Sequence, residues 1–140
     1  MRKINIGRVV LGGLLAGGIV NVGETILNVA VAGPAMEEAL AARNLPPVGG
    51  SAIGGFVFIT FLVGIITVWL YAAIRPRFGP GPGTAVIAAL VVWFFAYLHQ
   101  SVAMVLMGIL PAKVTALGTV WGLVEIVVAS IAGAWVYAES

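Results

Sequence analysis

The feature that most restricts the fold is residues 13–28, an apolar segment that carries one carboxylate and two carboxamides where hydrocarbon side chains are expected. On an α-helix, steps of three and four residues return to the same side, so five of these positions share one face. They are Gly13, Gly17, Asn21, Glu24 and Asn28. Glycines allow a neighbouring helix to approach closely, and the polar residues then meet it. The segment therefore predicts a helix bundle with a polar layer in its interior.

The composition places this helix in a membrane. Of the 140 residues, 61% are hydrophobic and 9% are charged, and the mean hydropathy is +1.14. In soluble domains, about a quarter of all residues are charged. We therefore expect a multi-pass protein of the cell membrane, in contact with the lipid bilayer. The small net charge of +2 gives no indication of nucleic-acid binding, and the lack of cysteine excludes disulfides and thiolate metal sites.

Four apolar stretches are long enough to cross a hydrocarbon core of about 30 Å as helices. They cover residues 9–32, 52–74, 84–110 and 114–137. Residues 75–83, between the second and third stretches, contain three prolines and three glycines and cannot continue a helix. We therefore expect an all-α fold with one domain over residues 1–140, in which four transmembrane helices form an antiparallel bundle.

The loop between the first two stretches predicts a further helix. Pro34 suits the first turn of a helix, and Glu37 and Glu38 follow where acidic side chains interact favourably with a helix N-terminus. We therefore expect a short amphipathic helix over residues 34–44, which lies on the membrane surface in the first external loop.

The distribution of basic residues predicts the orientation, because loops rich in lysine and arginine remain in the cytoplasm. One side of the bundle holds Arg2, Lys3, Arg8, Arg75 and Arg77, and the other holds Arg43 and Lys113. Tryptophan and tyrosine in residues 69–71 and 135–137 fall on the more basic side, and such aromatic residues are enriched at membrane interfaces. Both termini are therefore expected in the cytoplasm.

Two further ionisable residues lie within the apolar stretches. His99, which precedes Gln100, shares a helix face with several alanines, and such a face packs against other helices. We therefore expect His99 to point into the bundle. Glu125 shares a face with Gly118 and Gly122, and this GxxxG spacing is typical of closely packed membrane helices.

These acids and the histidine are expected in one layer of the membrane. With a rise of 1.5 Å per residue, Glu24 and His99 lie about 22 and 24 Å from the cytoplasmic edge of the core, and Glu125 about 17 Å from the outer edge. An isolated ionised carboxylate there is costly, so each acid must be protonated, paired with His99 or a cation, or hydrated. The predicted ligand or proton site comprises Glu24, Glu125, His99, Asn21, Asn28 and Gln100.

Three functions agree with such a site, and none of them is an enzymatic activity. The first is a proton-coupled transporter or channel for a cation or a small polar compound. In having four spans and a glutamate, Glu24, in the first of them, the chain resembles the small multidrug transporters. The resemblance is one of architecture, because the long loop over residues 33–51 and the turn over residues 79–83 depart from that family's pattern.

The second function is that of an accessory subunit, whose polar faces pack within a larger membrane complex. The third is an intramembrane metal or haem site, for which Glu24, Glu125 and His99 are the candidate ligands. A purely structural alternative also exists, in which Glu24 is a protonated clamp bonded to Asn21, Asn28 or Gln100. The sequence identifies no cofactor, and it favours a homo-oligomer or a membrane partner subunit.

The orientation is directly testable. A reporter fused after Ser140 should read cytoplasmic, and one inserted near Asn44 should read external, because the basic residues and the interfacial aromatics agree. A reporter pair with the opposite pattern would invert the placement of every loop.

Overall fold

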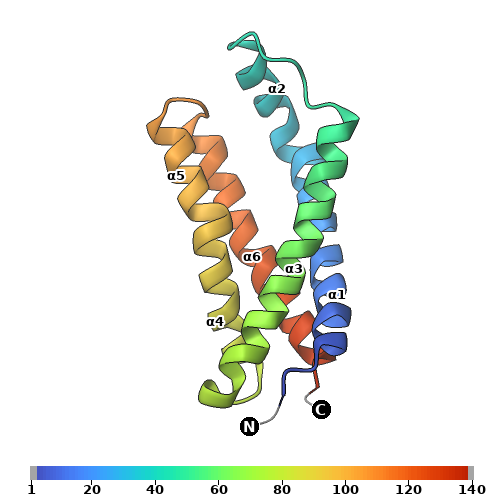
Figure 1. The fold of residues 1–140 in the computed structure, drawn as a ribbon. Coiled ribbons are helices and arrows are strands. Elements are labelled where there is room, and N and C mark those ends of the chain that lie inside the picture. The colour runs from blue at the N-terminus through green and yellow to red at the C-terminus, as the bar shows by residue number, and fades with distance from the viewer. Residues whose placement is uncertain (1–2, 139–140) are drawn as a thin grey trace.

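The computed structural model describes residues 3–138 and confirms an all-α protein in which four long helices pack antiparallel (Figure 1). The first helix combines α1 (Ile6–Ile26), the π-helical turn η1 (Leu27–Ala32) and α2 (Gly33–Ala41), and the second is α3 (Gly50–Phe78). The third combines α4 (Pro82–Trp93), the π-helical turn η2 (Phe94–Leu98) and α5 (His99–Leu106), and the fourth is α6 (Ala112–Val136). In this part of the chain, all four are long and apolar enough to cross a membrane.

Several helix ends differ from the sequence expectation. α3 continues through Pro76 to Phe78, although residues 75–83 were expected to interrupt the helix. A helix forms at Gly33–Ala41, but it continues the first long helix instead of standing apart in the loop. Pro34 lies in its first turn, and the wider π-helical turn before it lets the helix pass the proline without ending. The third helix ends at Leu106, before residue 110, and Gly108 then adopts a left-handed conformation with φ 68°.

Glycines set the closest contacts between helices. α1 packs mainly against α3 and α6, and α4 packs against α6 and α3. A Cβ atom at Gly64 of α3 would overlap the Gly13 carbonyl oxygen and the Gly17 backbone of α1. On the other side of α1, a Cβ atom at Gly12 would lie 2.5 Å from the Gly133 carbonyl oxygen of α6. The backbone of α1 therefore touches both neighbouring helices directly.

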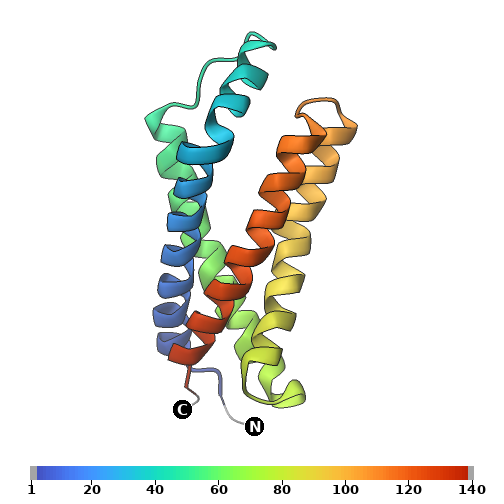
Figure 2. The same cartoon turned by 180° about the vertical axis from the view of Figure 1, so that it is seen from behind.

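The two halves of the bundle are packed differently. In the half that holds both chain ends, Val20, Val68 and Ile126 are almost completely buried between helices. In the other half, α2 and the neighbouring part of α3 diverge from the pair formed by α5 and α6 (Figures 1 and 2). All residues over 50–58 of α3 are exposed there, and they include Phe56 and Phe58. Most of the buried residues thus lie in the terminal half and the middle of the bundle.

Aromatic contacts hold the terminal half together. The rings of Tyr71 and Tyr137 meet edge to face at 6.0 Å, and the Arg75 guanidinium lies 5.6 Å from the centre of the Tyr137 ring. The Tyr137 hydroxyl accepts a bond of 3.4 Å from the backbone N–H of Asn5. These contacts join the two chain ends to α3, so both termini lie at the same end of the bundle.

The glycine crossing gives a packing prediction. Gly64→Ala should lower the thermal stability of the detergent-solubilised protein by an amount equivalent to about 1–3 kcal/mol, because the added methyl group overpacks a backbone contact. Gly54→Ala on the same helix is the control, since its Cβ atom would meet nothing within 4 Å. Equal unfolding temperatures for the two variants would contradict the close crossing.

Candidate functional site

The two intramembrane carboxylates come together between α1 and α6. Glu125 is 6% exposed, and its side chain lies at hydrogen-bonding distance from that of Glu24, which is half-buried. Gly23 of α1 makes this possible, because a Cβ atom there would overlap Glu125 Oε2. Sequence spacing had placed the acids on two separate helices, and the tertiary structure makes them one pair.

Aromatic side chains enclose the pair. The Tyr97 hydroxyl, from η2, donates a hydrogen bond of 2.9 Å to Glu125 Oε1. The Tyr97 ring packs on Gly122 of α6, where a side chain of any size would occupy the place of the ring. The Trp121 indole N–H donates to the Gly23 carbonyl oxygen at 3.1 Å and also borders the Glu125 carboxylate. Glu125 is therefore covered from α1, from the third helix and from its own helix.

On the other side of the pair, Glu24 contacts the carboxamide that the sequence analysis singled out on its own helix. Asn28 Nδ2 donates to Glu24 Oε2 at 3.2 Å and to the Glu24 carbonyl oxygen at 2.8 Å. Asn21 Nδ2 donates instead to the Gly17 carbonyl oxygen at 3.0 Å and to that of Val57, on α3, at 3.4 Å. Asn28 thus contacts the carboxylate pair, whereas Asn21 joins α1 to α3.

The chemistry of the pair follows from its burial. Glu125 Oε2 is buried, and no N–H or O–H donor reaches it among residues 3–138. Two carboxylates in contact in a medium of low dielectric constant repel each other strongly if both are ionised. A proton shared between Glu24 and Glu125 removes this repulsion and satisfies the remaining oxygen. The arrangement can therefore hold a proton, or a cation in its place.

The expectation that His99 points into the bundle is wrong. His99 and Gln100 are both exposed, away from the carboxylate pair. The cause is η2, because a π-helical turn inserts one residue and rotates every following residue by about 100°. A straight helix would turn Ala96 and Gln100 inward. With the inserted residue, the side chains that turn inward are those one position later, Tyr97 and Ser101.

Sequence reasoning missed the aromatic part of the site. Tyr97 and Trp121 combine a large apolar surface with one polar atom, which is typical of aromatic residues that bond to buried polar groups. The sequence contains no signal for this contact, because Tyr97 lies on a different span from Gly122 and Glu125. Hydrogen bonds on both sides of Tyr97 hold the third helix on α6. They are Trp93 Nε1 to the Thr119 carbonyl oxygen at 2.9 Å and Thr119 to Ser101 at 2.7 Å.

The ligand set of the metal hypothesis is not assembled. It required Glu24, Glu125 and His99 together, and His99 lies outside the pair. In the part of the chain that the structure describes, no three His, Cys, Asp or Glu side chains gather at one place. A single carboxylate pair provides too few protein ligands for the metal or haem site considered from the sequence.

The predicted packing glycines differ in their surroundings. Gly13, Gly17 and Gly122 lie at close contacts, and a Cβ atom at Gly17 would lie 2.8 Å from Phe61 Cα. Gly118 does not, because its Cβ atom would meet only the Leu27 side chain at 3.9 Å, which is an ordinary contact. This difference agrees with the divergence of the helix pairs in the half of the bundle away from the chain ends (Figure 2).

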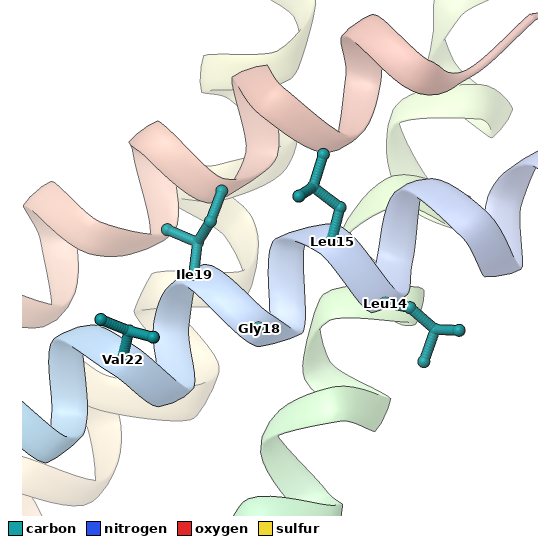
Figure 3. Close-up of a pocket in the computed structure, with 5 residues that line it drawn as sticks. All are labelled: Leu14, Leu15, Gly18, Ile19 and Val22. Atoms are coloured by element: carbon teal, nitrogen blue, oxygen red, sulfur yellow. The ribbon is translucent and has the colours of Figure 1, made fainter.

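Two hollows on the surface of α1 are lined by neither Glu24 nor Glu125. One of about 460 Å³ lies on the surface of α1 around Gly18, where Leu14, Leu15, Ile19 and Val22 form its walls (Figure 3). All of these residues are apolar, so this hollow offers no polar ligand. Comparison of the chain with known protein families, with curated proteins and with solved structures gives no match.

The contact between Gly23 and Glu125 gives a site prediction. Gly23→Ala should displace the Glu125 carboxylate from Glu24 and lower the thermal stability of the protein, although alanine favours a helix by about 1 kcal/mol over glycine. Gly18→Ala, on the same helix, should keep or raise stability, because its Cβ atom would meet nothing within 4 Å. If Gly23→Ala proved as stable as Gly18→Ala, the Glu125 carboxylate would not lie against Gly23.

Proposed function

We propose that this chain is a small multi-pass protein of the cell membrane, with both termini in the cytoplasm, that couples protons to the movement of a cation or a small polar compound. The observation that carries the proposal is the contact between Glu24 and Glu125, two carboxylates from different helices. Intramembrane carboxylates are costly and commonly mark ion pathways and proton relays.

The surroundings of the two acids differ, and this difference supports transfer of a proton by the pair over permanent retention of it. Glu125 is buried and bonded to the Tyr97 hydroxyl, whereas Glu24 is half-buried and bonded to the exposed Asn28. A proton or cation that reaches the membrane interior therefore meets Glu24 first. A bound cation and the shared proton both neutralise the negative charge of the pair. Binding of a cation at Glu24 therefore favours release of the proton.

A second candidate is an accessory subunit of a larger membrane complex. It is supported by the exposure of His99 and Gln100 on a membrane-crossing helix, where a partner helix can satisfy their hydrogen bonds. In that case the carboxylate pair has a structural role, and a proton stays on it at all times.

Infrared difference spectroscopy in lipid tests the proposal. Between about pH 5 and pH 9, we expect the protonated carboxyl band of the parent protein to decrease as the pair releases its proton. Glu24→Gln and Glu125→Gln should each alter this change, because the remaining carboxyl no longer shares a proton. Glu38→Gln is the control, since Glu38 is exposed near the end of α2 and should leave the intramembrane band unaltered.

A flux measurement distinguishes transport from mere proton binding. In proteoliposomes with an entrapped pH-sensitive dye, an imposed potassium diffusion potential should drive proton entry through the parent protein and much less through Glu24→Gln. A carboxyl band that does not change with pH would overturn the proposal. So would equal proton flux in the two proteins, or no flux in either.

A further inference from the structure

The outward face of the first long helix carries polar atoms that form only part of the hydrogen bonds open to them. Thr25 and Asn28 are exposed there, in the middle of a helix that is long and apolar enough to cross the membrane. The Thr25 hydroxyl donates to the Asn21 carbonyl oxygen at 2.7 Å, and the Asn28 amide donates twice to Glu24. These bonds use the donors and leave the hydroxyl and amide oxygens as acceptors. The face therefore suits a partner that supplies N–H donors.

Another face of the same chain offers N–H donors. His99 and Gln100 of α5 are exposed, and an imidazole and a carboxamide both provide N–H donors. The two faces lie at the same height along the bundle. Tyr97 donates a hydrogen bond to Glu125, and the Glu125 side chain contacts that of Glu24. The donors that follow Tyr97 are thus level with the acceptors beside Glu24.

The shapes of the two faces also agree. A hollow of about 260 Å³ lies beside Thr25 and is lined by Asn21, Val22, Thr25 and Ile26. On the third helix, Phe95 is 67% exposed and lies one turn before His99. The first and third helices run in the same direction, so a parallel alignment that brings His99 to Thr25 brings Phe95 to the hollow (Figure 1).

We propose that a second copy of this chain docks on the first through these faces, with His99 and Gln100 of one copy donating to Thr25 and Asn28 of the other and Phe95 in the hollow. When two copies are inserted in the membrane in the same orientation, the donors of one copy lie at the same depth as the acceptors of the other. The contact is head to tail, so repetition generates a closed ring when the rotation permits. The proposal does not depend on proton coupling.

Cysteine cross-linking between two differently tagged copies tests this contact, because the natural chain contains no cysteine. Thr25→Cys and Gln100→Cys are each placed in a separate full-length chain, and the two chains are co-expressed and oxidised in native membranes. We expect a disulfide-linked heterodimer as the main cross-linked product. Val124→Cys, at a position 62% exposed beside Glu125, replaces Thr25→Cys in the control and should give little product with Gln100→Cys.

Several outcomes would overturn the proposal. They are the absence of the Thr25 to Gln100 product, a Thr25→Cys homodimer as the main product, and equal cross-linking with Val124→Cys. The mass of the otherwise unsubstituted Phe95→Ala chain in lipid nanodiscs is the second measurement, and we expect it to shift from an oligomer toward a monomer relative to the parent chain. An unchanged mass would mean that another surface, or another protein, covers these faces.

Discussion

Direct contact between helix backbones is the constraint on which the rest of the structure depends. In a bilayer the hydrophobic effect does not drive helices together, so association relies on close packing and on polar contacts. The crossing of Gly13 and Gly64, and that of Gly12 and Gly133, bring α3 and α6 against the same helix. Only this closeness brings Glu125 over Gly23 and into contact with Glu24. The polar site is thus a consequence of helix crossings that themselves contain no polar side chain.

The carboxylate pair lies between two irregular helix turns. η1 (Leu27–Ala32) begins soon after Glu24, and η2 (Phe94–Leu98) supplies Tyr97 to Glu125. π-Helical turns are rare and occur frequently at functional sites, where they redirect a side chain that a regular helix would aim elsewhere. Here η2 turns a tyrosine hydroxyl toward the pair and turns His99 away from it. The same local irregularity therefore completes the buried site and creates the exposed donors on α5.

The two proposals meet at Glu24, which is half-buried in a single copy. Asn28 bonds the Glu24 carboxylate and also carries one of the acceptors offered to a second copy. A neighbour docked there would cover Glu24 from the membrane side. Association and proton binding would then act on the same carboxylate, although each rests on separate observations.

The sequence alone determined the number of long helices and their antiparallel order, because hydropathy and turn residues act locally and lipid permits few other structures. It also grouped Glu24 with Asn28, because Asn28 follows only four residues later, at the start of η1. The α-helical period failed for His99, because it was extended through η2, where one extra residue changes the face. No local signal distinguishes Tyr97 from its neighbours. Only the packing of its ring on Gly122 and its bond to Glu125, contacts between distant parts of the chain, decided which side chains face the site.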